Sequence, residues 1–275
     1  MTTTLGPPVL IDGPLPEAPP YGLVPTVPII PTADDHWMAG GSVYGYTADT
    51  PAPFDPCSQG SDRYKVIAEA GPLPDFAGFA LYLGIRCTAA SIGSDAELHE
   101  RVQRMFAAVE SFGVEREFAT GAALALNPHL NDGGADLLAA AAVTPFEALA
   151  LLEDAIGRTG RRGVIHAPPS TISQWDWRVF DVGGKLRTRN GTLVVSGGGY
   201  TDVIDDGAGA LAADEQWAWA TGPIEIRRSE IYQLPNTLAE ALDRETNTVV
   251  VYAERNYLVD WDTALQASVL IDRIP

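Results

Sequence analysis

The sequence has little that could form a covalent framework or a metal centre. Cys57 and Cys87 are its only cysteines, and neither belongs to a CxxC pair. A disulfide framework or a structural zinc site needs more cysteines at closer spacing. The four histidines, which are His36, His99, His129 and His166, fall in no metal-binding helix pattern. Asp34 and Asp35 precede His36 without distant partners, which is typical of a polar surface. We therefore expect no metal site and no cofactor.

Long apolar runs and basic side chains are also scarce. No stretch reaches the roughly 18 apolar residues that a membrane helix needs, and the N-terminus has no basic segment leading into an apolar one. We expect a chain that is neither secreted nor membrane-spanning. Lysine occurs only as Lys65 and Lys185, and 36 acidic against 18 basic residues give a net charge of −18. This balance argues against a surface that grips phosphates. It fits a solvated acidic surface, or one that faces packed nucleic acid without sticking to it.

The usual catalytic motifs do not occur. Ser196 lacks the glycine two residues earlier that a nucleophile elbow requires. Residues 207–212 imitate a dinucleotide fingerprint, but Asp205 and Asp206 precede them where a pyrophosphate would have to lie. His166 at the end of a predicted strand is typical of a satisfied structural histidine. The sequence therefore offers no catalytic residue.

The N-terminal stretch combines prolines with apolar residues. Residues 1–32 contain nine prolines, so the sequence predicts an extended arm rather than a helix or a central strand. Valine, leucine and isoleucine are interleaved with them, which is unusual for a free polar tail. Such an arm needs a surface to lie on, either its own domain or a neighbouring subunit.

The stretch from Ser94 to Gly121 predicts a long helix. Ser94 and Glu97 form a capping box at its start. One apolar stripe follows at helical spacing and consists of Leu98, Val102, Met105, Val109 and Phe112. The polar residues between them are predicted to face away from this stripe, namely His99, Arg101, Arg104 and Glu110. A helix continuing past Gly113 to Phe118 would be about 36 Å long. Ahead of it, alternating residues in 64–68 and 79–85 predict a long two-stranded hairpin.

The rest of the chain mixes short helices and strands. Thr144 and Glu147 form a second capping box with proline between them, and Asn190-Gly191 predicts a hairpin that joins 185–187 to 192–195. Ser170 is predicted to cap a short helix, and another helix is predicted over 238–244. Strands are predicted at 164–167, around Gly222-Pro223, and at 249–252, 257–259 and 267–271. Without a repeating βαβ unit, this order predicts an α+β fold.

Several local sequences resemble the major capsid proteins of tailed bacteriophages, specifically those infecting actinobacteria. They are Phe79-Ala80-Leu81-Tyr82 with Cys87, Val114-Glu115-Arg116-Glu117-Phe118, Leu186-Arg187-Thr188 with residues 191–195, and Ala253-Glu254-Arg255. The resemblance spans roughly residues 60–272. It implies a non-enzymatic shell subunit that assembles into an icosahedral head around double-stranded DNA.

The resemblance also implies a division of the chain. Residues 1–59 would be an N-terminal arm, 60–93 an extended hairpin loop over a neighbouring subunit, and 94–126 the spine helix of a peripheral domain. Residues 127–235 would be largely the axial domain, and 236–275 would return as C-terminal strands to the peripheral domain. The arm and the hairpin would then be buried by other copies.

Partners and location follow from the same resemblance. We expect copies of the chain in pentamers and hexamers, with scaffolding, portal and decoration proteins as further partners. Packaged DNA would lie on the inner face without sequence-specific binding, and no membrane would be involved. The subunit would be assembled in the host bacterial cytoplasm and reside in the virion.

The sequence is also compatible with different assignments. Some members of the fold form a lysine–asparagine isopeptide bond beside a glutamate, for which Lys65 with Asn247 or Asn256 would be the candidates. An encapsulin-like compartment shell shares the fold. A monomeric enzyme assembled from Asp34, His36 and His166 is a further hypothesis, and so is a tail or decoration protein.

Overall fold

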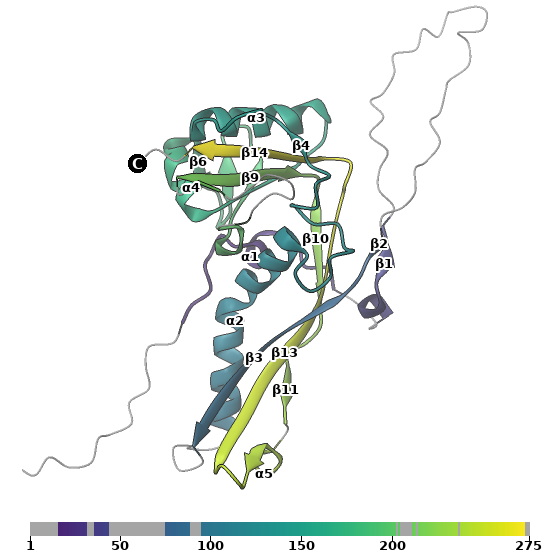
Figure 1. Cartoon of the computed structure of the whole chain (residues 1–275), viewed down its shortest axis with the longest axis vertical. Coiled ribbons are helices and arrows are strands. Elements are labelled where there is room, and N and C mark those ends of the chain that lie inside the picture. The colour runs from purple at the N-terminus through teal and green to yellow at the C-terminus, as the bar shows by residue number, and fades with distance from the viewer. Residues whose placement is uncertain are drawn as a thin grey trace, which may run out of the picture.

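The computed structural model describes residues 16–31, 36–43, 75–88, 95–201, 203, 211–212, 214–235 and 237–272. Within them, one long helix and a long sheet form an elongated body, and a second sheet carrying a helix lies across one end of it (Figure 1). The predicted α+β class is confirmed.

The elongated body is built on a sheet centred on β13, which we call the β13 sheet. β13 spans Thr248–Trp261 and pairs antiparallel with β3 along the whole length of β3. The strands are β3 (Phe79–Thr88), β10 (Ile224–Arg228), β11 (Tyr232–Leu234), β12 (Leu242–Asp243), which follows the short helix α5 (Leu238–Ala241), and β13. The prediction of separate strands at 249–252 and 257–259 is wrong. Polar residues at 254–256 interrupt the apolar run, but their backbone continues the ladder.

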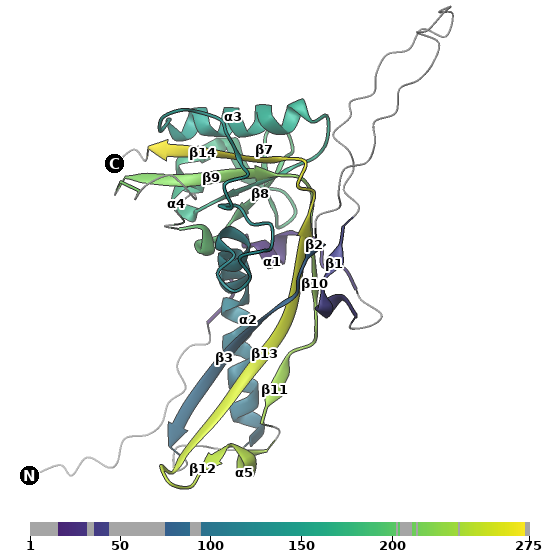
Figure 2. The same cartoon turned by 45° about the vertical axis from the view of Figure 1, so that its right-hand side comes forward.

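The predicted long helix is present as α2 (Asp95–Thr120), which lies along the β13 sheet (Figure 2). It continues past Gly113 because the missing side chain admits β3: a Cβ at Gly113 would lie 2.7 Å from Cδ1 of Leu81. The capping residue Ser94 lies outside the described residues.

The buried face of α2 differs from the predicted stripe. Leu98 and Val102 are buried as expected, but Val109 is 46% and Phe112 is 54% exposed. Beyond Val102 the buried apolar positions include Phe106, Val114 and Phe118, the last two spaced by four residues. Between Phe106 and Val114, the buried position on this face is occupied by Glu110. Because Glu110 is charged, a search for apolar residues does not identify it as buried.

The second sheet, which we call the β9 sheet, is covered on both faces. Its order is β4-β14-β9-β5-β8-β7-β6. Its strands are β4 (Asp136–Leu137), β14 (Gln266–Asp272), β9 (Glu215–Thr221), β5 (Val164–Ala167), β8 (Leu193–Ser196), β7 (Leu186–Thr188) and β6 (Val179–Asp181). Helices α3 (Pro145–Arg158) and α4 (Pro169–Trp175) share a core with Ile165 and Ala218. Val164 and Trp219 on the other face share a core with Val114 and Phe118 of α2. The helix α2 thus contacts both sheets.

Local sequence signals around the β9 sheet were partly right. Thr144 caps α3 by accepting from the Glu147 amide, as predicted, and β7 and β8 form the predicted hairpin around Gly191, whose φ of 88° favours glycine. The prediction that Ser170 caps α4 is wrong. The cap residue is Pro168, and the Ser170 hydroxyl donates instead to Oε1 of Gln216 on β9.

The described part of the arm is not wholly extended. Residues Leu23–Thr26 form one helical turn, α1, and Leu23, Val24 and Val27 are buried against the same copy. Pro25 is tolerated because the first amides of a helix have no intrahelical acceptor. For this part, the expectation that other copies bury the arm is wrong. Residues 1–15 lie outside the described residues.

The prediction that residues 79–85 form one side of a hairpin loop is wrong. Strands β1 (Gly41–Ser42) and β2 (Asp75–Phe76) pair with each other, and residues 44–74 between them lie outside the described residues. Residues 79–88, assigned by sequence to the loop over 60–93, instead form β3. The predicted partner strand at 64–68 lies outside the described residues. Alternation identified a strand but could not identify its partner.

Two further domain boundaries differ from the prediction, again because alternation identifies a strand but not its partner. β10 and β11, predicted within the axial range 127–235, pair with β13. β14, predicted to return to the body of the spine helix, joins β9 and β4 instead. The chain therefore crosses between the sheets at 222–223 and 262–265.

Candidate functional site

His166 is enclosed in the core rather than placed at a reactive surface. The side chain is fully buried in β5, with Nδ1 at 3.1 Å from the Tyr200 hydroxyl and Nε2 at 3.0 Å from Oγ1 of Thr221. Since the Thr221 hydroxyl donates to the Gly222 carbonyl, it accepts from Nε2–H of the ring. Tyr200 then donates to Nδ1. Burial lowers the pKa of His166 to about 3, so the ring is neutral and serves the structure.

Glu110 joins α2 to two strands of the β13 sheet. Its Oε1 accepts from Arg228 on β10 at 2.8 Å, and its Oε2 accepts from Arg255 at 2.8 Å and from the Tyr257 hydroxyl at 2.7 Å, both on β13. The carboxylate is buried, and Arg255 is nearly so. Burial and the neighbouring Glu110 carboxylate raise the pKa of Tyr257. The helical pattern predicted that Glu110 would face away from the core, and this prediction is wrong. The alternating positions of Arg255 and Tyr257 on β13 were the signal that could have indicated a partner.

Glu115 fastens the arm to α2 and to the glycine run. Its Oε1 accepts from the Leu23 amide at 2.8 Å, and its Oε2 accepts from the Gly199 amide at 3.0 Å. Ser111 donates to Glu115 and accepts from the Val24 amide. These two side chains cap α1, whose own preceding residue is glycine. Burial raises the pKa of Glu115, while the three hydrogen bonds that it accepts oppose the rise.

The remaining candidates from the sequence do not converge. His36 lies exposed in the short helix η1 (His36–Ala39), which packs on β13, whereas His166 is enclosed by the β9 sheet. Asp34 and Lys65 lie outside the described residues. Asn247 occupies an exposed turn with φ of 50°, and Nδ2 of Asn256 contacts Sδ of Met38. Over the described part of the chain, no group of three His, Cys, Asp or Glu side chains could hold a metal ion.

Within the described ranges, no helix combines the length and the apolar character needed to cross a membrane.

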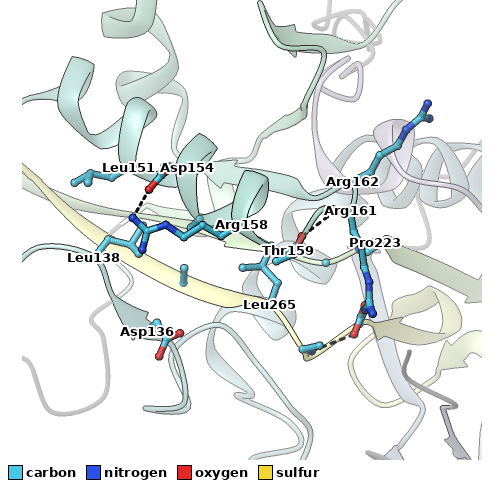
Figure 3. A pocket seen from close by; sticks show the side chains of 15 residues that line it. Asp136, Leu138, Leu151, Asp154, Arg158, Thr159, Arg161, Arg162, Pro223 and Leu265 are labelled. Carbon is cyan, nitrogen blue, oxygen red and sulfur yellow. Dashed lines mark hydrogen bonds and ion pairs between the residues drawn. The ribbon is translucent and has the colours of Figure 1, made fainter. Parts of the chain in front are cut away.

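A pocket of about 340 Å³ lies where α3 meets the crossings between the two sheets. Arg158 is paired with Asp154 at 2.5 Å, and Arg161 is paired with Asp262 at 3.3 Å (Figure 3). Two of the arginines that line the pocket are therefore neutralised by carboxylates of the same pocket. The guanidinium of Arg162 points away from the other labelled side chains (Figure 3). The Arg161–Asp262 pair joins the segment after α3 to the β13–β14 crossing.

An arginine–aromatic patch lies beside α3 and the β7–β8 hairpin. Arg178 stacks on the rings of Phe146 and Trp177, 3.9 Å and 4.5 Å from their centroids, and Arg189 stacks on Trp177 at 4.0 Å. Phe146 is 56% and Trp177 is 52% exposed. The patch borders a groove of about 510 Å³ between α3 and the β7–β8 hairpin. Large exposed rings of this kind mark surfaces that contact other molecules. No sequence pattern indicated the patch, since its members come from three separate segments.

Known structures share this fold. A capsid chain of a native GTA particle matches with a TM-score of 0.56 at 14% identity, covering 99% of this chain and 96% of that one. A chain of Microbacterium phage Oxtober96 matches with a TM-score of 0.53 at 11% identity, covering 99% and 96%. A chain of Gordonia phage Cozz matches with a TM-score of 0.53 at 10% identity, covering 100% and 92%.

Sequence comparison adds nothing to these matches. No protein-family model and no curated protein sequence matches the chain. At such low identity the likeness establishes the fold alone. The chain has the fold of the major capsid proteins of tailed bacteriophages.

Proposed function

We propose that the chain is the shell subunit of an icosahedral phage head that encloses double-stranded DNA. The observation that carries this proposal is the length of the structural match, because 99% of this chain superposes on 96% of a capsid chain. Such coverage leaves little of either chain for a separate function.

The exposed surface supports many copies rather than one. Large hydrophobic side chains stay exposed on both bodies, with Tyr82 at 76% on β3, Phe112 at 54% on α2 and Trp177 at 52% beside β6. Contacts between copies would bury them. A structural role also fits the buried, hydrogen-bonded state of His166.

The division of the chain is part of the proposal. The β13 sheet with α2 would be the peripheral domain, and the β9 sheet with α3 and α4 would be the axial domain around five-fold and six-fold centres. The segment between β1 and β2 would be the extended loop, and residues 1–31 the arm. This replaces the boundaries predicted from sequence while keeping their roles.

The acidic charge would face the packaged DNA. A net charge of −18 repels phosphates, so DNA could be packed inside without being bound. Scaffolding, portal and decoration proteins would be further partners during assembly in the host cytoplasm. The finished subunit would reside in the virion.

Electron microscopy of the purified protein and of particles from its native source tests the proposal. We expect closed or curved lattices with five-fold and six-fold centres, and DNA inside native particles. If microscopy finds small soluble species and no lattice, the shell proposal is contradicted. Particles filled with an enzyme instead of DNA would favour an encapsulin-like compartment. A single monomer band after boiling in detergent would exclude an isopeptide bond at Lys65.

A further inference from the structure

The β9 sheet has two free edges. At one end β6 pairs with β7, and at the other β4 pairs with β14; in the described part of the chain neither has a second strand neighbour. Unpaired edges expose backbone donors and acceptors, and proteins cover them or use them for association. Each edge is therefore a candidate surface for association with another chain.

The β6 edge is apolar and basic. Trp177, Phe180 and Val182 are 52%, 43% and 48% exposed along it. The basic residues of this stretch are Arg178, Lys185, Arg187 and Arg189, and its acidic residues are Asp176 and Asp181. Asp181 already accepts from the Tyr21 hydroxyl at 2.7 Å. Neither Arg178 nor Arg189 pairs with a carboxylate in the described residues.

The β4 edge is apolar and acidic. Leu137 is 55% exposed on it, flanked by the exposed Asp132 and Asp136. The sequence from residue 117 to residue 157 contains no lysine or arginine. Of the arginines that share a pocket with Asp136, Arg158 and Arg161 are ion-paired within the copy, and the guanidinium of Arg162 points away from Asp136 (Figure 3). The edge therefore keeps its negative charge.

We propose that the β6 edge of one copy docks against the β4 edge of the next, head to tail. This inference rests on the proposed shell function and names the surfaces that close its rings. Arg178 and Arg189 would meet Asp132 and Asp136, and Trp177 and Phe180 would cover Leu137. A head-to-tail contact uses two different patches on each copy, so its repetition generates a ring wherever the rotation between copies closes, as at five-fold and six-fold centres. A symmetric contact would instead place like charges together at either edge.

Charge reversal at each edge tests the contact. We expect the variants R178E/R189E and D132K/D136K each to assemble at least about tenfold less than the original chain, since like charges across an interface are strongly unfavourable. A chain carrying all four substitutions should assemble again. The control is E100K/R104E, which swaps an exposed ion pair on α2 and should assemble normally.

Mixing the two reversed variants gives a sharper readout. Each would repel its own kind and attract the other, so copies must alternate around a ring. Native mass spectrometry should then find six-membered rings but none with five members, because alternation needs an even number. Five-membered mixed rings would overturn the inference.

Other outcomes separate the inference from the proposed function. If the original chain forms particles and R178E/R189E forms them equally well, the edge contact is wrong while the shell function stands. If the original chain forms no lattice, the proposed function fails. Far-UV circular dichroism checks that the variants fold. For any that does not, the milder R178Q/R189Q and D132N/D136N should assemble less than the original chain, and unchanged assembly would overturn the contact.

Discussion

The two sheets attach to their helices by different means. The β13 sheet holds α2 partly through a buried carboxylate, Glu110, with two arginines and a tyrosine around it. The β9 sheet holds α3 through an apolar core that includes Leu149, Leu152 and Ile156. Apolar packing tolerates small shifts, whereas a hydrogen-bonded charge cluster has one good geometry. The difference indicates that the position of α2 along β13 is specified by polar contacts, and that of α3 by shape.

The largest effect should come from breaking the charge cluster. Glu110→Gln leaves Arg228 and Arg255 without their carboxylate, and we expect a loss of about 3–5 kcal/mol in the free energy of unfolding. Urea unfolding measures it. The control is Glu100→Gln on the same helix, where the exposed pair with Arg104 should contribute less than about 1 kcal/mol. Equal losses in the two variants would show that Glu110 has no special role.

The β9 sheet should reveal its buried histidine through pH. The unfolded chain protonates His166 below its ordinary pKa of 6.5, whereas the folded ring stays neutral to about 3. Its contribution is therefore complete above pH 6.5 and is lost as the pH falls. Between pH 7 and pH 4.5 we expect the original chain to lose about 2.5 kcal/mol more than His166→Gln.

Unfolding curves of the unassembled chain at several pH values measure this difference. Glu115, whose raised pKa acts in the opposite direction, is present in both proteins and cancels. His36→Gln, at an exposed histidine, is the control. Parallel pH profiles for His166→Gln and the original chain would contradict the assignment.

A smaller effect should come from the arm. A Cβ at Gly22 would lie 2.4 Å from Oγ of Ser111 and 2.7 Å from Oε1 of Glu115. We expect Gly22→Ala to cost about 1–3 kcal/mol and to loosen residues 16–31. Limited proteolysis should cut the arm faster. Gly41→Ala is the matched control, since a Cβ at that position would have nothing within 4 Å. Unchanged cleavage would mean that the arm is held by other contacts.

The smallest effect on stability should come from the arginine–aromatic patch. Trp177 is half exposed, so Trp177→Ala should change the unfolding free energy of a single copy by less than about 1 kcal/mol. Assembly yield, followed by light scattering, should nevertheless fall. If Trp177→Ala destabilises the single copy but assembles normally, Trp177 stabilises the fold and takes no part in association.

Sequence patterns predicted local structure better than pairing. The capping box at Thr144 and the Asn190-Gly191 turn act over a few residues, so their chemistry is legible in the chain. The ladder between β3 and β13 joins residues more than 150 positions apart, and many strands have the same alternation. The predictions for the hairpin with 79–85, for the axial range and for β14 were wrong for this reason.

Buried polar groups were hidden for a different reason. Glu110 and Glu115 resemble solvated helix residues until their partners on other elements are known. The glycine run at 197–199 allows the chain to approach α2 closely, since a Cβ at Gly199 would lie 2.5 Å from Cβ of Glu115. The satisfied state of His166 was predicted correctly, because a histidine at the end of a buried strand has few other options.

The reach of α2 has a mechanical consequence. Since a single uninterrupted helix is packed on both sheets, the copy should behave as a stiff tile whose two ends tilt together. Curvature would then have to be taken up where one copy meets the next, or at the crossings 222–223 and 262–265. A lattice of such rigid subunits would change its curvature at the contacts between copies.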